Sequence, residues 1–430
     1  MGAGTGRAGP AGAGAGATGR RGEGMSEVMD LEALNYDLAQ EVVPEWWRKL
    51  LSCMQCGTCS ATCPTAYAMD YTPRQLWQMI RLGLEAEVLT SRTFWLCTVC
   101  KSCQVRCPRG IRLTDTMVAL KEYAHRQGAE VPELLVTLGE TVLQHHNISG
   151  DDNKTRLIWS QNLPDPPMGV NPLRRTAEVV YFVGCVSAFY PRAYSIPQAL
   201  VQVLDRAGVA FTTLGGEELC CGYPLYVAGL GERMAELARH NLERVRGVGA
   251  KRVVFSCPSC YYAWSHLYPE MMDVSGLQFQ HATEFLAEVL TGGKLPLGPV
   301  EMAVTYHDPC DLGRKSGVYD APREVLRAIP GLELREMESS GVDGMCCGGG
   351  GDVEIADREV TVSVAARRLA QVQATGANTV VSACQQCKRT LQEGARKNRI
   401  RVRAIDVVEL LWLSVQTADQ IAEDEQAVGG

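Results

Sequence analysis

Strands and helices alternate twice along the second half of the chain. The apolar runs at residues 179–183 and 302–307 each predict a buried strand. The same series of elements follows each run: a helix, a short strand, a long helix, a third strand and an amphipathic helix. The expected ranges are 195–207, 210–214, 230–246, 252–256 and 283–290 in the first copy, and 322–329, 332–337, 357–375, 379–382 and 407–413 in the second. This alternation predicts two small α/β layers whose functional groups gather at the C-terminal ends of the strands.

The first part of the chain has helical patterns instead. Apolar residues recur at helical spacing from 27 to 50, and further helices are expected at 115–125 and 131–143. Between the first two, Thr72 as N-cap, Pro73 at the first position and Gln75 predict a helix that begins with a capping box. The proline-rich segment 163–172 predicts a stiff linker. The basic run 397–403 alternates with Ile400 and Val402 like a half-exposed strand.

Composition narrows the class of protein. Of the 430 residues, 46% are hydrophobic and 21% charged, as is usual for a globular protein. The net charge of -7 does not indicate nucleic-acid binding, which needs a basic surface. No apolar run approaches the roughly 18 residues of a membrane span, so we expect a membrane link only through a partner. Residues 1–26 form a Gly/Ala-rich tail that we expect to be disordered, with Met25 as a candidate start. Because no apolar signal core is present there, we expect a cytoplasmic protein.

The eighteen cysteines fall into one set of eight and two sets of five. Each set of five has a lone cysteine, a doublet followed by glycine, and a CxxC pair, and the two copies are offset by 125 to 127 residues. The first copy contains Cys185, Cys220, Cys221, Cys257 and Cys260, and the second contains Cys310, Cys346, Cys347, Cys384 and Cys387. Regular sets of this kind indicate metal or cluster ligation rather than free structural thiols.

The set of eight consists of two CxxCxxCxxxCP runs, typical of bacterial two-cluster ferredoxins, in which the fourth cysteine of each run binds the other cluster. We therefore expect one 4Fe-4S cluster on Cys53, Cys56, Cys59 and Cys107, and a second on Cys97, Cys100, Cys103 and Cys63. Since the spacer between the runs is long, the assignment of each fourth cysteine to the other cluster is based on the motif and not on geometry. Structural zinc fits the pattern poorly, because zinc sites pair ligands from two separate knuckles.

Five thiols in each repeat exceed the four that one cubane cluster needs. Adjacent cysteines suit a site in which one sulfur bridges metals, and the glycines after each doublet let the backbone approach such a site closely. A zinc site in either repeat is the alternative, and it predicts about eight irons in the chain where four clusters predict about sixteen. The run Gly348, Gly349, Gly350 and Gly351 has no equal in the first copy, so we expect that side to approach the substrate more closely.

These motifs identify a family. The repeat Cx34CCGx34CxxC resembles the CCG domain of heterodisulfide reductases, and the segments CMQCGTCSATCPTAYAMDYTPRQL and WLCTVCKSCQVRCPRGIRLTD resemble their small two-cluster protein. The order is similar to the fused type, in which the ferredoxin-type part and the CCG part form one polypeptide. The resemblance implies an α-helical two-cluster ferredoxin domain followed by two α/β CCG domains. It also implies that each set of five cysteines binds a noncubane 4Fe-4S cluster and that the two clusters face a disulfide substrate.

The expected division of the chain follows from this resemblance: a tail at 1–26, the ferredoxin-type domain at 27–127, a linker at 128–176, CCG repeats at 177–296 and 297–416, and a C-terminal tail at 417–430. The expected activity is reduction of a disulfide with electrons that enter through the ferredoxin-type domain. No Rossmann-type GxGxxG motif is present, so neither NAD nor flavin is expected. The electrons then come from a flavoprotein or a membrane cytochrome. The alternative is an electron-transfer subunit that links a flavin-dependent 2-hydroxy acid or glycerol-phosphate dehydrogenase to quinone.

Some residues outside the cysteine sets have two interpretations. His307 and Arg314 flank Cys310 and are candidate proton or charge donors, although a structural strand-end histidine and a surface arginine are favoured. The adjacent His145 and His146 are expected to be surface residues. The pair Trp46 and Trp47 is expected to pack against the domain that follows, and a partner-docking role is the alternative.

Overall fold

The computed structural model describes residues 31–171 and 176–429. The chain divides into two units, Met1–Leu34 and Asn35–Gly430. The one element described in the first unit is the 3-10 helix η1 (Leu31–Ala33). Everything below concerns the second unit, which holds all eighteen cysteines.

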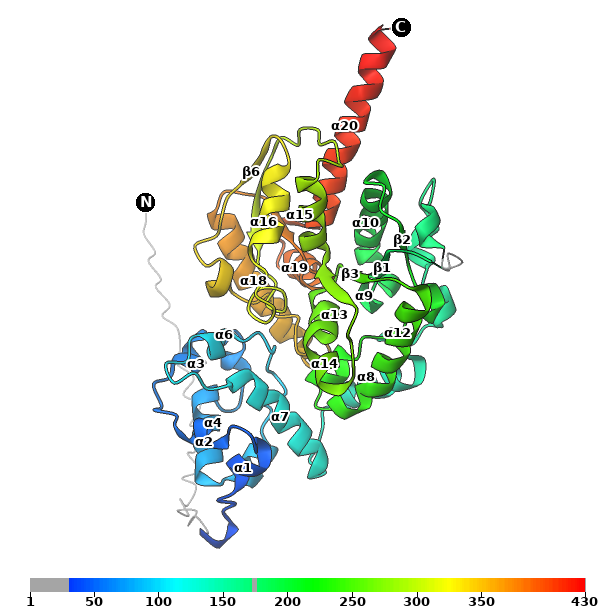
Figure 1. Ribbon diagram of the computed structural model, residues 1–430. Helices are drawn as coiled ribbons and strands as arrows, with labels where there is room; N and C mark the ends of the chain where they lie inside the picture. The colour runs from blue at the N-terminus through cyan, green and yellow to red at the C-terminus, as the bar shows by residue number, and fades with distance from the viewer. Residues whose placement is uncertain (1–30, 172–175, 430) are drawn as a thin grey trace, which may run out of the picture. The chain divides into compact units, whose positions relative to one another are not determined.

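The first part of this unit is helical, as the sequence predicts (Figure 1). Its helices are α1 (Leu38–Val42), α2 (Trp47–Leu51), α3 (Thr58–Thr62), α4 (Pro73–Leu82), α5 (Glu85–Leu89), α6 (Ser102–Val105) and α7 (Leu113–Arg126), with the short turn η2 (Ala66–Ala68). Helix α4 begins with the predicted capping box of Thr72 and Gln75. Its apolar face, with Leu76 and Trp77 fully buried, belongs to the core of this part of the chain.

The helix expected at 27–50 is wrong for the residues that the structure describes, and its first residues lie outside them. Helix α1 ends at Val42, and α2 begins only at Trp47. Pro44 lies between them, and proline lacks the N–H that a continuous helix needs. Trp46 and Trp47 pack against the core of this part of the chain, and the Trp46 Nε1 donates a hydrogen bond to Thr116 Oγ1 on α7 (3.1 Å).

A connecting segment follows, with α8 (Glu133–His145) and three 3-10 turns, η3 (Asn153–Thr155), η4 (Ile158–Ser160) and η5 (Met168–Val170). The proline-rich stretch expected as a linker lies against the first sheet, where Thr213 N donates to Gly169 O (3.0 Å). His145 and His146 are exposed, which confirms the expectation for them.

Both repeats contain a four-stranded parallel sheet with the same topology. The first has the order β2-β1-β3-β4 and the second β6-β5-β7-β8, so the first strand of each repeat lies in the middle beside the third. The strands are β1 (Val179–Phe182), β2 (Phe211–Thr212), β3 (Arg252–Phe255) and β4 (Gln278–His281), and β5 (Met302–His307), β6 (Leu332–Leu334), β7 (Thr379–Ser382) and β8 (Arg403–Asp406). The register pairs Val180 with Val253 in one sheet and Tyr306 with Val381 in the other.

Helices surround these sheets in both repeats. The first repeat has α9 (Cys185–Phe189), α10 (Ser195–Arg206), α11 (Tyr223–Val227), the turn η8 (Gly231–Met234), α12 (Ala235–Val248), α13 (Pro258–Tyr262), the π-helix η9 (Ala263–Leu267), α14 (Tyr268–Met271) and α15 (Ala282–Thr291). The second has α16 (Asp320–Ala328), α17 (Val353–Ala356), α18 (Arg358–Ala374), α19 (Gln385–Lys397) and α20 (Val407–Gly429). Turns η6 (Pro191–Ala193), η7 (Gly215–Glu217) and η10 (Gly341–Asp343) complete the connections.

The two repeats pack crosswise. Helix α10 near the start of the first repeat contacts α20 at the end of the second, and α15 contacts α16 in the same way (Figure 1). At the centre, Gln385 of the second repeat donates to Val183 O (3.0 Å) and Ser256 Oγ (2.8 Å) of the first. The side chain of Gln385 therefore joins the strand ends of the two repeats.

Several predicted boundaries need correction. The basic run 397–403 is not a strand: α19 continues to Lys397, Arg399 has a left-handed φ of 54°, and β8 begins only at Arg403. Ile400 and Val402 are apolar because they cover the end of α19, where Ile400 N donates to Ala395 O (2.9 Å). The helix expected at 230–246 starts at Ala235, after a 3-10 turn that begins at a glycine. Helix α20 continues far past the expected end at 413, to Gly429.

Candidate metal centres

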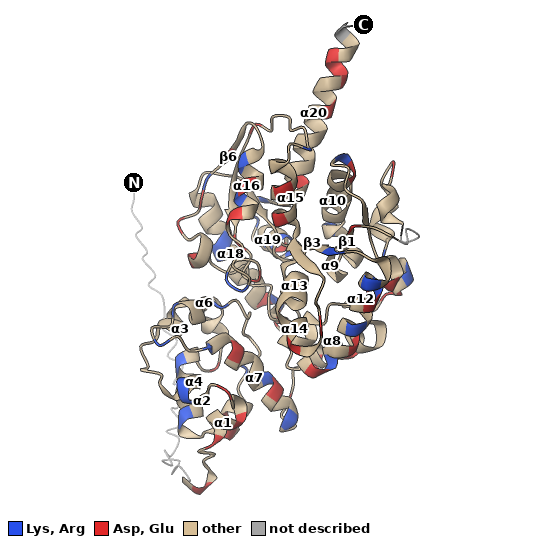
Figure 2. Cartoon of the chain, viewed as in Figure 1, with Lys and Arg blue, Asp and Glu red and all other residues tan. Residues whose placement is uncertain are grey.

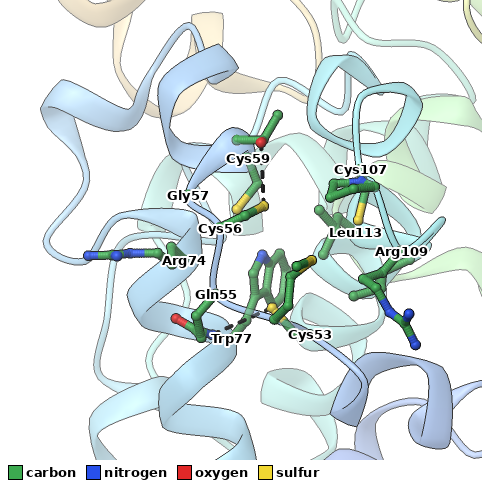
Figure 3. Close-up of a pocket in the computed structure, with 14 residues that line it drawn as sticks. Cys53, Gln55, Cys56, Gly57, Cys59, Arg74, Trp77, Cys107, Arg109 and Leu113 are labelled. Carbon is green, nitrogen blue, oxygen red and sulfur yellow. Dashed lines mark hydrogen bonds between the residues drawn. The ribbon is translucent and has the colours of Figure 1, made fainter.

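The first four cysteines expected to act together line one pocket (Figure 3). Cys53, Cys56, Cys59 and Cys107 surround it beside the ring of Trp77, which α4 supplies. The loop between Cys53 and Cys59 has left-handed backbone at Gln55 (φ 58°) and Gly57 (φ 83°). These turns allow the three thiols of this loop to point into the same pocket. None of the four is in a disulfide. The donor set therefore fits the first cubane cluster.

The second expected set is more deeply buried. The pKa of the Cys103 thiol is raised by burial and then by the charges of Cys97, Cys100 and Cys63, which places Cys63 among the cysteines of the other run. Burial likewise raises the pKa of Cys63 to about 12. Isolated thiolates are unfavourable in such surroundings, whereas metal ligation favours the thiolate form. This donor set also fits the exchange of fourth cysteines that the motif implies.

The second set touches the CCG repeats directly. The thiols of Cys100 and Cys346 lie close enough for each to shift the pKa of the other, and this interaction lowers the pKa of Cys100 and raises that of Cys346. Arg314 Nε donates to Cys100 O at 2.6 Å. The favoured interpretation of Arg314 as a surface residue is wrong, because Arg314 is only 9% exposed between the first part of the chain and the second repeat. The ferredoxin-like and CCG cysteines thus form one continuous group.

The glycine run after the second doublet explains how the two parts come so close. A Cβ atom at Gly350 would lie 2.8 Å from Thr98 O, and one at Gly351 would overlap Cys97 O. Gly349–Gly351 also line the cavity described below, but Cys346 and Cys347 do not. Close contact with the loop of Cys97 accounts for these glycines better than the expected approach to substrate alone.

Replacing Gly351 with alanine should therefore disturb this contact. Gly351 has φ 62°, so alanine meets both left-handed strain and the overlap with Cys97 O. We expect a loss of about 2–4 kcal/mol in unfolding free energy, since strain and overpacking add. Gly341→Ala is the matched control, because Gly341 has φ 59° with no atom near its Cβ position. Equal urea midpoints for the two variants would show that the overlap is not important.

All five cysteines of the first repeat line one side of a cavity of about 350 Å³. Each of these thiols shifts the pKa of the next, in the order Cys185, Cys220, Cys221, Cys260 and Cys257, so the five lie close together. The lone cysteine begins α9 at the end of β1, and the CxxC pair follows the end of β3. Adjacent parallel strands thus bring the thiols to one sheet edge, as the alternation predicts.

A buried ion pair supports this site, and no sequence motif indicates it. Arg156, in the connecting segment, donates to Glu218 Oε1 (2.8 Å) and to Cys185 Sγ (3.4 Å). Both charged side chains are at most 2% exposed. Glu218 also accepts hydrogen bonds from the N–H groups of Val183 and Gly184, at the end of β1. Arg156 lies in a polar turn along the sequence, so only the fold reveals its role.

The second repeat gathers its cysteines in the same way. Cys346, Cys347, Cys384 and Cys387 are buried, and Cys310 is partly buried. His307, at the end of β5, lies with Cys347 and Cys387 in a group whose ligand atoms are within 4.8 Å of one another. Arg368 Nε donates a hydrogen bond to His307 Nδ1 (3.1 Å). His307 is thus a buried strand-end residue, as favoured, and it also directly faces the thiols.

A polar cluster connects the two cysteine sets. Asp311, next to Cys310, accepts a hydrogen bond from Ser259 Oγ (2.6 Å) within the CxxC pair of the first repeat. It also accepts from Tyr223 OH (3.2 Å) and pairs with the buried Lys315 (2.8 Å). Lys315 donates in turn to Tyr223. Since Tyr223, Ser259 and Asp311 all line the cavity, the cavity lies between the two repeats.

Comparison with known protein families agrees with this organisation. A model described as a 4Fe-4S dicluster domain matches residues 49–111, and one described as a cysteine-rich domain matches twice, at 179–264 and 304–392. The ferredoxin-type part and the two α/β repeats were thus predicted correctly. No helix in the described ranges is long and apolar enough to cross a membrane.

Curated relatives resemble most of the chain. A subunit of the dihydromethanophenazine:CoB--CoM heterodisulfide reductase of Methanosarcina barkeri is 32% identical over 391 residues, which cover 84% of this chain and 93% of the relative. The probable iron-sulfur-binding oxidoreductase FadF of Bacillus subtilis is also 32% identical, over 82% of this chain and 50% of its own. EtfAB:quinone oxidoreductase of Syntrophomonas wolfei is 28% identical, over 86% and 59%.

Among solved structures, a hypothetical protein from Helicobacter pylori matches with a TM-score of 0.52 and 10% identity, over 88% of this chain and 76% of that one. At this identity the match shows a shared fold and nothing about function.

Proposed function

Because the chain belongs to the family of iron-sulfur oxidoreductases that includes this heterodisulfide reductase protein of Methanosarcina, we propose that it reduces a disulfide compound in the cavity between its two CCG repeats. The observation that carries the proposal is the complete set of five cysteines in both repeats. The first set lines the cavity, and Asp311, next to Cys310 of the second set, accepts hydrogen bonds from Ser259 and Tyr223 at the same cavity. A protein that only relays electrons has no need for two complete sets.

The proposed cluster ligands are the cysteine sets that the sequence motifs predict. Cys53, Cys56, Cys59 and Cys107 hold one cubane cluster, and Cys97, Cys100, Cys103 and Cys63 hold the second. Each set of five holds a noncubane cluster. When bound, such clusters supply single electrons, and cleavage of a disulfide to two thiols consumes two electrons and two protons. The close approach of the Cys100 and Cys346 thiols brings the ligand sets of the two parts of the chain together.

The cavity suits a small disulfide compound. Its volume of about 350 Å³ lies within the range of sites for small molecules. Arg358 and Arg389 are among its lining residues, and Arg389 lies over the ring of Tyr190 (4.1 Å to the centroid). Arg358 pairs with Glu393 (2.8 Å) and Arg389 with Glu354 (3.5 Å). A guanidinium group carries five N–H donors and can bind a carboxylate or sulfonate as well, so these arginines favour a thiol compound that carries an anionic group.

The experiment compares acceptors for the purified, cluster-loaded chain reduced by methyl viologen. We expect reduction of disulfides of small anionic thiols to two thiols per two electrons, and slower reduction of a quinone. Rapid quinone reduction without any disulfide cleavage would support the second candidate function instead. That candidate, electron transfer between a flavin-dependent dehydrogenase and quinone, is favoured by the similarity to EtfAB:quinone oxidoreductase.

A buried lysine should set the potential of the second cubane cluster. Lys121 on α7 is fully buried, and Nζ donates to Val227 O (2.8 Å). Burial raises the pKa of Cys97 to about 11, and the charge of Lys121 is the largest influence in the opposite direction. A cation near the cluster favours the reduced state, so Lys121→Met should lower one potential by about 60 mV, a tenfold change in a one-electron equilibrium.

The measurement is a redox titration followed by EPR. Lys251→Met, at an exposed position just before β3, is the control and should leave every potential unchanged. If no potential moves in Lys121→Met, Lys121 has only a packing role.

A further inference from the structure

The edge of the first cubane site is open to solvent. Cys56 is the one exposed cysteine of the eighteen, and Met54 beside it is 63% exposed. Leu51, at the end of α2, is exposed as well. Every cysteine of the second cubane set is less accessible. An apolar, accessible edge beside a redox centre is where a protein partner can exchange electrons.

Basic side chains lie on the helices next to this edge and on the loop after Cys107. Arg48 and Lys49 belong to α2, Arg74 and Arg81 to α4, and Arg109 follows Cys107. Arg74 and Arg109 line the pocket itself (Figure 3), and Arg81 Nη1 donates to Cys53 O (2.9 Å). None of these five has an ion-pair partner among residues 31–171 and 176–429. We call these five residues the basic rim.

The basic rim contrasts with the rest of the chain. Residues 45–112 contain nine Lys and Arg against four Asp and Glu, although the whole chain has a net charge of -7. Figure 2 shows the basic residues of this part on α2 and α4, and acidic residues on α1 and α7. The nearby Glu45 acts on Arg112, which is not part of the rim. The electrostatic potential at the open edge is therefore positive.

The rim is not explained by the cluster alone. In the described part of the chain, the side chains of Arg74 and Arg109 make no hydrogen bond and no ring contact, so neither contributes such a contact to the stability of the fold. Unpaired cations around an apolar centre are suited to steering and orienting a partner of opposite charge.

We propose that the basic rim docks an electron-transfer protein whose cofactor is surrounded by acidic side chains. The proposal rests on the proposed function in one respect, because it takes the first cubane site as the point where electrons enter. Encounter complexes of redox proteins are small and weak, with electrostatic steering as the main source of rate. A charged rim around a small apolar edge meets that requirement.

The test uses the full, cluster-loaded chain and flavodoxin, an acidic flavoprotein, as the probe. Stopped-flow reduction by reduced flavodoxin should slow at least tenfold between low and high salt. The double variant Arg74→Glu/Arg109→Glu should be at least tenfold slower at low salt and nearly independent of salt. Binding of oxidised flavodoxin, measured without turnover, should weaken in parallel. Cytochrome c, a basic acceptor, should show the opposite salt dependence.

Arg233→Glu/Arg239→Glu, a pair of exposed arginines on the first repeat, makes the same charge change away from the rim and should leave both measurements unchanged. Rates of reduction by flavodoxin that depend neither on salt nor on the charge of the basic rim would overturn the proposal. Rim-dependent binding to vesicles containing phosphatidylglycerol, with flavodoxin unaffected, would overturn it in favour of a membrane contact. Disulfide reduction driven by methyl viologen separates the two proposals, since it needs no docking partner.

Discussion

Replacing Cys346 with serine should abolish disulfide reduction and remove about four iron atoms from the chain, since serine is a poor substitute for a thiolate ligand. Cys346 is the thiol that meets Cys100, so the same change also removes the contact between the ferredoxin-like cysteines and the second repeat. The two cubane clusters should remain, because their eight ligands are untouched. Iron analysis and EPR of the reduced protein measure both effects.

The neighbouring Met345 offers the matched control. Met345→Ser places the same side chain one position earlier and should keep the iron content and the activity. Unchanged iron and an intact noncubane signal in Cys346→Ser would contradict the assignment of this site. A wild-type content of about eight irons, with zinc present, would instead support zinc in the repeats.

Replacing Arg156 with methionine should destabilise the first CCG site by about 3–5 kcal/mol, because Glu218 keeps a buried charge without its partner. The hydrogen bond to Cys185 is lost at the same time. We therefore expect a lower urea midpoint and selective loss of the noncubane cluster of the first repeat. Anaerobic denaturation and iron release over time measure the change.

Two controls separate the buried charge from other effects. Arg156→Met/Glu218→Gln should recover part of the loss, because the uncompensated carboxylate is removed. Arg206→Met breaks an exposed pair with Asp419 and should cost at most about 1 kcal/mol. A double variant as unstable as, or less stable than, Arg156→Met would show that the charge on Glu218 is not the cause.

The sequence predicted the parts of the fold that have a periodic signal. Both buried strands that open the repeats, at 179–183 and 302–307, stood out as apolar runs, and β1 and β5 match them closely. The helix after the second CxxC pair was missed because α19 is largely polar along its length, and Cys384, which was interpreted only as a ligand, is also its N-cap. Cys384 Sγ accepts a hydrogen bond from Cys387 N there (3.3 Å).

The sequence indicates the candidate ligands of the site but not their surroundings. Cysteine spacing gives every candidate thiol, since ligand motifs are local. Contacts between distant segments leave no such pattern: Arg156 meets Cys185, and Arg314 meets Cys100, only because the connecting segment and the ferredoxin-like part pack against the repeats. The glycine run is plain in the sequence, but its contact with Cys97 and Thr98 arises only in the folded chain.

The most direct test of the central claim is a single turnover of the fully reduced chain, freed of excess reductant and mixed with one small anionic disulfide. The account predicts that two thiols appear for every two electrons lost from the clusters, and that Cys346→Ser releases none. Clusters that stay reduced in the presence of a range of such disulfides, yet are oxidised rapidly by a quinone, would contradict it.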